Sequence, residues 1–398
     1  MGRIKGIALG ALNYRMGGQL SSLISLAESL QTEGLNARVL LPNGISDFSK
    51  AALTRFTRKS FPFRLKSVAG MLYEQARRDD ELFHLMLPTP GFAGMARAFG
   101  FRTDRTLLQW EGRPLAFDRE TLCAAKDDFA YLLPRLLLNH QCLDVAARLC
   151  GYHQLVTTQS FAAWLKRRGH RKVSCITNFA LLSKDDLEPP GEELGSFLAD
   201  PTPLVGYIGH AHPVKGVGDL LEAFLSAQAR RPELRLLLAL SMDGDGRVLT
   251  QRRNMLPAQV KSRILITGTV PVGTVLGRLD ALVLPYRMIL STTMVPSLLL
   301  EADLARCPVI LSDLDDFSDI VPRNEAGWYL VPPANVEMLA KAMVVLPLRL
   351  QTKGLNIASV TDRVAQLIEL YARVGGREPG ELYGQACLLS RPKDCRQL

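Results

Sequence analysis

The sequence lacks any run of about 18 apolar residues, the length that a membrane-spanning helix needs. The apolar part of the N-terminal stretch "MGRIKGIALG" is also too short for a secretory signal. The seven cysteines are scattered and lack the paired short spacings of zinc sites, so we expect reduced thiols and no metal. These absences predict a cytoplasmic protein that is soluble or, at most, peripheral on the inner face of the membrane.

What is present is an ordinary globular composition, with 47% hydrophobic and 22% charged residues. A chain of 398 residues exceeds what one hydrophobic core usually supports, so two domains are expected. The formal net charge of +9 favours an acidic partner, which can be a nucleic acid, an anionic membrane face or a phosphorylated substrate. Charge alone does not choose among the three.

Short apolar runs alternate with amphipathic stretches along most of the chain. An apolar run at 4–12, an amphipathic stretch at 19–34 and a second apolar run at 36–42 predict a strand, a helix and a strand. The right-handed crossover of such a unit implies a parallel sheet. Further strands are predicted at 82–87, 105–110, 152–158 and 172–178. A second series has strands at 204–210, 234–241, 263–270, 281–286 and 308–313, and helices at 216–231, 296–306 and 334–346.

A stretch rich in proline, glycine and acidic residues, at about 183–203, separates the two series and predicts a hinge. The fold class is therefore α/β, with two Rossmann-like, doubly wound parallel-sheet domains that face a central cleft. Ligands are expected at the carboxyl ends of the strands. The predicted boundaries are an N-terminal domain at 1–185, a linker at 186–203, a C-terminal domain at 204–355, a helix at 356–376 and a tail at 377–398.

The second domain opens with "GYIGHAHPVKGVGDLLEAF", in which a strand ends at Gly209 and a helix starts near Gly218. The loop between them carries His210, His212 and Lys215. Free backbone N–H groups at the helix start and a nearby cation form an arrangement that binds phosphate. The alternative interpretation is a solvated loop lysine beside a tight turn.

The stretch "STTMVPSLLLEADLARCPVILSD", residues 291–313, places Glu301 on an apolar helix after a loop rich in hydroxyls. Pro296 suits the first turn of that helix. A carboxylate in this position can accept hydrogen bonds from two vicinal hydroxyls, as acidic residues do with the ribose in dinucleotide sites. The alternative, an exposed helical glutamate, fits poorly with so apolar a helix.

These motifs occur in an order that resembles the C-terminal domain of the retaining GT-B glycosyltransferases of family four. The order is G-x5-K-G, a glycine after a strand in "TGTV", "LDALVLPY", "PSLLLEADLARCPVILSD" and "DIV" followed by "GWYLVPP", over about 204–345. The resemblance implies the GT-B fold, a nucleotide-sugar donor with UDP or GDP as the nucleotide, retention of anomeric configuration, and neither a metal nor a cofactor. It also implies that Lys215 holds the diphosphate and Glu301 the ribose hydroxyls.

The resemblance assigns further residues to the donor. Gly209 and Gly268 follow strands of the second domain, and a glycine loop is matched by Gly17 and Gly18 before the first helix. The loop before Glu301 is expected to present backbone amides to the phosphates and the donor sugar, from Thr292, Thr293, Met294 and Val295.

On the acceptor side, "FHLMLPTPGFAGMA", which contains His84, resembles the strand and loop that line the acceptor cleft. The helix at 356–376 resembles the one that crosses back to brace the N-terminal domain.

Three positions depart from the family pattern. Thr293 stands where a glutamate usually contacts the donor sugar, and His210 stands where an arginine usually follows the strand glycine. Because His210 carries charge only when protonated, the change weakens the diphosphate clamp by about 1–2 kcal/mol. Glu111 stands where many relatives have a histidine near the reacting sugar. Glu111 can position or deprotonate an acceptor hydroxyl, or it can pair with an arginine and take no part in chemistry. The catalytic candidates are thus Glu111, Lys215 and His210.

Residues 55–66, "RFTRKSFPFRLK", interleave cations with phenylalanines, which suits an anionic membrane surface. Nucleic acid and a solvated loop are the alternatives, and we expect no nucleic acid partner. The leading hypothesis is a glycosyltransferase that acts on a glycan, lipid-linked or small-molecule hydroxyl. A catalytically impaired relative that binds nucleotide sugar or a partner subunit is the second hypothesis, and an epimerase or phosphorylase is the third.

Overall fold

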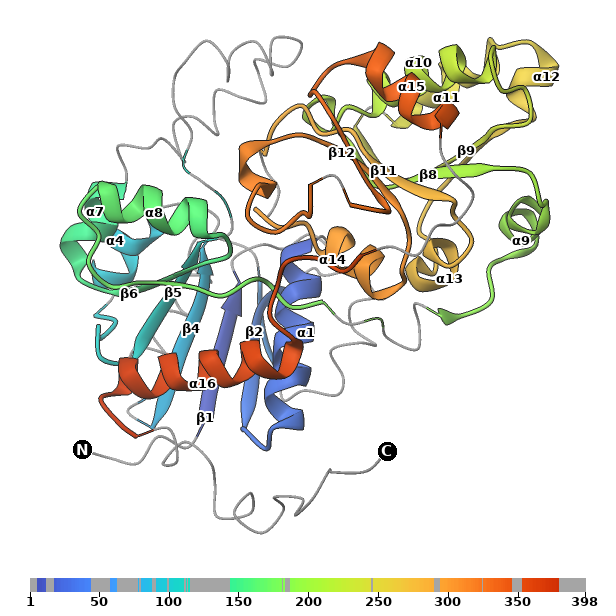
Figure 1. Ribbon diagram of the computed structural model, residues 1–398. Helices are drawn as coiled ribbons and strands as arrows, with labels where there is room; N and C mark the ends of the chain where they lie inside the picture. Colours follow the sequence, from blue (N-terminus) through green and yellow to red (C-terminus); the bar gives the residue numbers. More distant parts are fainter. Residues whose placement is uncertain are drawn as a thin grey trace, which may run out of the picture.

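The chain folds into two halves, each built on a parallel β-sheet with helices packed against it (Figure 1). The computed structural model describes residues 6–11, 18–43, 58–62, 78, 80–87, 91–98, 100–110, 112, 114, 144–180, 182, 187–244, 246–289, 294–323, 325–345 and 353–378. The α/β class and the two doubly wound parallel sheets are confirmed. Within these described ranges, none of the helices combines the length and the apolar character needed to span a lipid bilayer.

The sheet of the N-terminal half has seven strands in the order β3-β2-β1-β4-β5-β6-β7. Its strands are β1 (Gly6–Ala11), β2 (Ala37–Asn43), β3 (Arg58–Pro62), β4 (Glu81–Leu87), β5 (Thr106–Trp110), β6 (His153–Val156) and β7 (Val173–Cys175). The short apolar runs become strands because a sheet that is covered on both faces buries both sides of each strand. β5, for example, is buried at all five positions.

The sheet of the C-terminal half has six strands in the order β10-β9-β8-β11-β12-β13. Its strands are β8 (Leu204–Ala211), β9 (Arg235–Gly244), β10 (Ile264–Thr267), β11 (Ala281–Leu284), β12 (Val309–Ser312) and β13 (Trp328–Val331). β11 and β12 are buried throughout, as their continuous apolar sequences predict.

In both sheets, the order in which successive strands are added reverses beside the first strand. β1 pairs with β2 on one side and β4 on the other, and β8 pairs with β9 and β11 in the same way. The chain therefore crosses to one side of β1 or β8 first and to the other side later, so the strand order reverses between β1 and β4 and between β8 and β11. Ligands of open α/β sheets bind at such reversal points.

The helices fill the crossovers between strands. Those of the N-terminal half are α1 (Gly18–Thr32), α4 (Gly91–Ala98), α7 (Asp144–Cys150) and α8 (Gln159–Arg167). Those of the C-terminal half are α9 (Glu192–Ala199), α10 (Val217–Gln228), α11 (Gly246–Asn254), α12 (Ala258–Lys261), α13 (Val272–Leu276), α14 (Ser297–Leu304) and α15 (Val336–Val345), with 3-10 turns η3 (Pro213–Lys215) and η4 (Asp315–Phe317).

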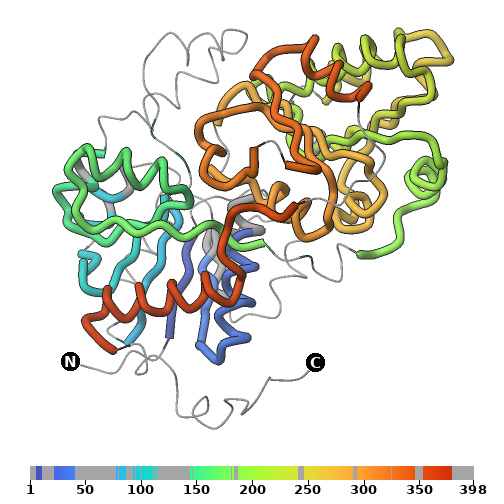
Figure 2. Tube along the Cα trace, in the orientation of Figure 1, coloured from blue at the N-terminus to red at the C-terminus, as the bar shows by residue number. Residues whose placement is uncertain are grey.

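The last helix, α16 (Val360–Gly375), returns to the N-terminal half, as the red segment of Figure 2 shows. Before it, the Leu355 N–H donates to Asp303 on α14, which ties the segment to the C-terminal half. The apolar face of α16 then joins the core of β1, β2, β4 and α1, and Leu367 and Tyr371 are fully buried there. The alternation of apolar and charged residues in this helix produces one buried face.

Two segments differ from the sequence-based expectation. Residues 58–62, expected within a basic surface loop, form β3, the edge strand that pairs with β2. Residues 192–199, expected within an extended linker, form α9. Leu194 and Leu198 of α9 belong to the C-terminal core, so this helix is part of the C-terminal half. The proline and glycine residues that suggested a hinge lie before the helix. They gave no indication that the two leucines after them are buried.

Candidate functional site

The turn between β8 and α10 lies at the reversal point of the C-terminal sheet. β8 ends past Gly209, whose φ of +145° falls in a region that side chains rarely adopt. His212 caps the short turn η3, and its Nδ1 accepts from the Val214 N–H. Gly216 closes the turn in the left-handed conformation at φ +68° and starts α10. The sequence K-G therefore marks the place where the chain turns into the helix, as the phosphate-site prediction requires.

The segment after β11 is fastened to this turn at three places. The Arg287 N–H donates to the carbonyl of Val214 at 2.9 Å. Gly216 lies so close to the carbonyl of Pro285 that an added Cβ would be 1.9 Å from its oxygen. The Arg287 guanidinium donates twice to Asp219, at 2.8 and 2.7 Å. The carboxyl ends of β8 and β11 are therefore held as one unit.

Lys215 projects from this unit and is 8% exposed. Its ammonium lies 4.2 Å from the centre of the Tyr286 ring, a cation–π contact. Burial lowers the pKa of Lys215 to about 7. A lysine that is withdrawn from water in this way gains most from an anion, because the anion restores the stabilisation that water no longer supplies. The environment favours the anion-binding interpretation over the solvated loop lysine.

The other predicted donor residues of this half occupy the same edge. His210 sits at the end of β8 where a bulge interrupts the pairing with β9, and its carbonyl accepts from the Tyr207 hydroxyl at 2.8 Å. Gly268 directly follows β10, and the space around its Cα is open.

Glu301 lies on α14, which follows β11, and its side chain is 9% exposed. The helix is buried at six of its eight positions, so Glu301 is a carboxylate within an apolar helix, as predicted. α14 packs against α1, the helix of the N-terminal half that follows the predicted glycine loop. The structure thus brings the helix of Glu301 to the boundary between the halves.

Met294 and Val295, expected to present amides to the donor, have fully buried side chains. Met294 joins the apolar cluster of the N-terminal half, which includes Trp110, and Val295 joins that of the C-terminal half. Their side chains therefore join the two halves, and the role of their amides stays a prediction. Gly18 is the first residue of α1. Four further predicted site residues lie outside the described residues: Gly17, Glu111, Thr292 and Thr293.

His84, expected on the acceptor side, does not lie where an acceptor could contact it. It lies on β4 with 1% of its surface exposed, and its Nδ1 shares a 2.7 Å hydrogen bond with the Tyr371 hydroxyl of α16. Burial lowers the pKa of His84 to about 4, so the ring is neutral at physiological pH. An acceptor cannot reach a side chain that α16 covers. The sequence pattern did not show this, because the covering helix is 287 residues away.

Sequence reasoning also missed Tyr286, Arg287 and Asp219, which organise the Lys215 turn. Asp219 in the first turn of α10 and Arg287 after β11 are 68 residues apart and form no local pattern. The apolar run "ALVLPY" predicted a strand that includes Tyr286, whereas β11 ends at Leu284 and leaves the tyrosine in the segment that follows it.

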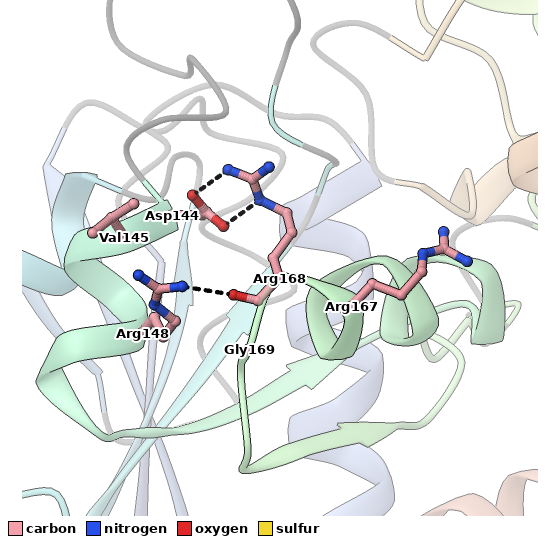
Figure 3. Close-up of a pocket in the computed structure, with 6 residues that line it drawn as sticks. All are labelled: Asp144, Val145, Arg148, Arg167, Arg168 and Gly169. Atoms are coloured by element: carbon pink, nitrogen blue, oxygen red, sulfur yellow. Dashed lines mark hydrogen bonds and ion pairs between the residues drawn. The ribbon is translucent and has the colours of Figure 1, made fainter.

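A separate open pocket of about 480 Å³ lies between α7 and α8 (Figure 3). Arg168 donates to Asp144 at 2.6 and 2.9 Å, and Arg148 donates to the Arg168 carbonyl. Burial opposes ionisation of Asp144, but hydrogen bonds from Arg168 and His170 outweigh it and hold the pKa of this carboxyl below its usual value. Arg168 precedes β7, so this side of the pocket lies where a strand begins, and the Asp144 carboxylate is already paired with Arg168.

Two other predictions concern partners. Of residues 55–66, only the strand residues 58–62 are described, so the membrane surface stays a prediction. Within the described part of the chain, no three or more His, Cys, Asp or Glu side chains gather as metal ligands do. Metal independence likewise stays a prediction.

A comparison with curated protein sequences finds no significant match. Among solved structures, HepE from Anabaena in complex with UDP-glucose is similar at 16% identity and a TM-score of 0.61, over 96% of this chain and 98% of that chain. A TarM variant from S. aureus, in complex with fondaparinux, alpha-GlcNAc-glycerol and UDP, is similar at 11% identity and a TM-score of 0.60, over 97% and 98%.

A putative UDP-N-acetylglucosamine 2-epimerase from Listeria monocytogenes is also similar, at 12% identity and a TM-score of 0.61, over 94% of this chain and 98% of that chain. At these identities the likeness concerns the fold alone. Residues 202–347, which contain the Lys215 turn and α14, match the family described as Glycosyl transferases group 1. The chain therefore has the GT-B fold, and the match to the family described as Glycosyl transferases group 1 falls within its C-terminal half.

Proposed function

We propose that the protein is a retaining glycosyltransferase that moves a sugar from a nucleotide-sugar donor to a hydroxyl acceptor. The observation that carries the proposal is the buried Lys215 ammonium, held on a left-handed turn at the reversal point of the sheet that matches the glycosyltransferase family. A cation at this place, beside the N-terminus of α10, suits a diphosphate. The proposal names UDP as the first nucleotide to test, because the HepE and TarM structures contain UDP, with GDP as the alternative.

Each proposed role follows from charge and position. Lys215 binds the diphosphate and stabilises the negative charge that grows on it as the bond to the sugar breaks. Glu301 accepts hydrogen bonds from the ribose hydroxyls. His210 adds charge beside the diphosphate when it is protonated, and Glu111 positions the acceptor hydroxyl. The departing phosphate takes the acceptor proton on the same face of the sugar, so the configuration is retained without an enzymatic nucleophile.

Two other functions need to be separated from this one. A catalytically impaired relative would bind nucleotide sugar without transfer, and Thr293 and His210 motivate that alternative. An epimerase would interconvert sugars without transfer, and the fold is compatible with it because the Listeria monocytogenes structure has the same fold. The family match of residues 202–347 favours transfer over epimerisation.

The test is release of nucleoside diphosphate from a panel of nucleotide sugars, with and without glycan, lipid-linked and small-molecule acceptors. Lys215→Ala and Glu301→Ala should each lower kcat/KM at least about tenfold, the cost of losing a charged hydrogen bond. Matched controls are Lys341→Ala and Glu337→Ala, which remove an exposed pair on α15 and should leave release unchanged.

Nuclear magnetic resonance of the product should show the anomeric configuration of the donor. Binding of UDP-sugar with no release on any acceptor supports the impaired relative, and interconversion of the sugar without an acceptor supports the epimerase. Equal activity in the Lys215→Ala and Lys341→Ala variants contradicts the proposed site.

A further inference from the structure

The Lys215 ammonium has an aromatic neighbour where a buried cation usually has a carboxylate. Within the described residues, no carboxylate forms an ion pair with Lys215, and the close contact of its ammonium is with the Tyr286 ring, 4.2 Å from the ring centre. Tyr286 itself is 4% exposed. Both partners of this contact are therefore largely withdrawn from water, the condition in which cation–π attraction is strongest.

The backbone holds Tyr286 in this place. Its two chain neighbours are both fastened to the turn that carries Lys215: the Pro285 carbonyl contacts Gly216, and the Arg287 N–H donates to Val214. The ring is therefore set against the lysine by main-chain contacts that do not depend on the lysine itself. This is a preorganised arrangement, in which the position of the cation is determined before a ligand arrives.

We propose that Tyr286 is a positioning residue that holds the Lys215 ammonium, by the face of its ring, for the diphosphate of the donor. The inference rests on the proposed function, because the diphosphate is the ligand that this function supplies. A carboxylate in place of the ring would neutralise the ammonium and compete with phosphate for its N–H groups. The ring attracts the cation through its quadrupole and leaves both the net charge and the N–H donors for the ligand.

The contact also has a consequence for protonation. Burial favours the neutral amine, whereas the ring face favours the charged ammonium, so the ring keeps part of the lysine protonated near neutral pH. Removal of the ring should therefore weaken binding of a diphosphate and move its loss to lower pH. A residue that only filled space would not move the pH dependence.

Two substitutions separate the ring face from the hydroxyl and from simple packing. Tyr286→Phe keeps the ring and removes the hydroxyl, whereas Tyr286→Leu keeps an apolar side chain and removes the ring. Tyr286→Met serves as a second ring-less variant in case the leucine does not fold, and thermal unfolding without ligand checks each protein. Tyr329→Leu, a half-buried tyrosine on β13, is the control for loss of a tyrosine elsewhere in the same half.

The probes are UDP and inorganic pyrophosphate, titrated calorimetrically into each protein across neutral pH. We expect Tyr286→Phe and Tyr329→Leu to bind both probes as the unmodified protein does. We expect Tyr286→Leu and Tyr286→Met to bind them about tenfold more weakly, with the loss of affinity beginning about half a pH unit lower. Unchanged affinity in both ring-less variants overturns the inference, and so does equal weakening in Tyr286→Phe.

The two probes distinguish failure of the inference from failure of the proposed function. If pyrophosphate binds with the expected dependence on Tyr286 but UDP does not bind, the donor proposal fails and the positioning role of Tyr286 stands. If UDP binds equally to all variants, the positioning role fails and the donor proposal stands. If the unmodified protein binds neither probe, both are wrong.

Discussion

The two halves of this molecule are wound alike but completed differently. The described part of the C-terminal core comes almost wholly from one continuous stretch, residues 194–355. The main core of the N-terminal half combines β1, α1, β2 and β4 with α16 from near the end of the chain. The difference teaches that the same sheet pattern can be self-sufficient in one half and dependent on a distant segment in the other.

Buried polar groups are used differently in the two halves as well. In the N-terminal half, several of them attach α16. Tyr371 bonds to His84, and the buried Arg363 guanidinium donates to the carbonyl of Asn178, whose side chain accepts from Gln109. In the C-terminal half, the buried Lys215 ammonium lies against the ring of Tyr286. These groups of the N-terminal half serve assembly, and we propose that Lys215 serves binding.

The largest expected effect concerns the turn between β8 and α10, which contacts the segment after β11. Gly216→Ala should lower the free energy of unfolding by about 3 kcal/mol or more, because its Cβ would meet the Pro285 carbonyl in a left-handed conformation. UDP binding should be lost with it. Gly218→Ala, two residues later in α10 with open space around its Cα, should instead stabilise the protein by up to about 1 kcal/mol. Urea unfolding of both variants gives the comparison, and similar values for the two would show that the close approach does not constrain the turn.

The next effect tests whether the N-terminal half depends on α16. Leu367→Ala should cost about 3 kcal/mol, because it empties a fully buried site between α16 and the sheet. Glu369→Ala, on the exposed face of the same helix, should change stability by less than about 0.5 kcal/mol. Hydrogen exchange should accelerate in β1 and β4 of the leucine variant and stay unchanged in β8 and β11. Equal acceleration in both sheets would mean that the halves unfold as one unit.

A smaller effect concerns pH and the C-terminal half. The pKa of Lys215 is lowered to about 7, and a bound diphosphate favours the ammonium, so binding takes up a proton above that pH. Affinity for UDP should therefore fall as pH rises above about 7, by up to about tenfold per unit, and should be insensitive to this lysine at lower pH. Calorimetry across this range measures the slope. Lys215→Arg stays charged and should remove this dependence of affinity on pH. If the dependence persists in the arginine variant, another group causes it.

The smallest effect concerns a bond between the halves. Asp319 accepts from the Ser160 N–H at 2.6 Å, at the start of α8 in the other half. Asp319→Ala should lower the free energy of unfolding by about 1 kcal/mol, because a carboxylate stabilises the exposed N–H groups of a helix start. Asp315→Ala, exposed on η4, is the matched control and should have no such effect. Thermal unfolding measures both, and equal stability of the two variants would show that the bond contributes nothing measurable.

Much of the architecture was predictable because it depends on local patterns in the sequence. The apolar runs of β8 and β11 and the glycine after Lys215 predicted strands, a turn and a helix start in the right places. The sequence analysis missed β3 because residues 58–62 combine cations with apolar residues. This composition is typical of a surface segment and also of an edge strand. α9 was missed because the proline and glycine residues before it dominated the pattern.

The sequence by itself determined the α/β class, the two sheets and the candidate pair Lys215 and Glu301, because each depends on residues within one strand–helix unit. Only the tertiary structure decided that His84 is covered, that Met294 enters the other half's core, and that Tyr286 faces Lys215. The physical reason is that these contacts join residues tens to hundreds of positions apart. Which residues meet in these contacts depends on the order of the strands in the sheets and on where α16 returns. No local periodicity of the sequence indicates either of these.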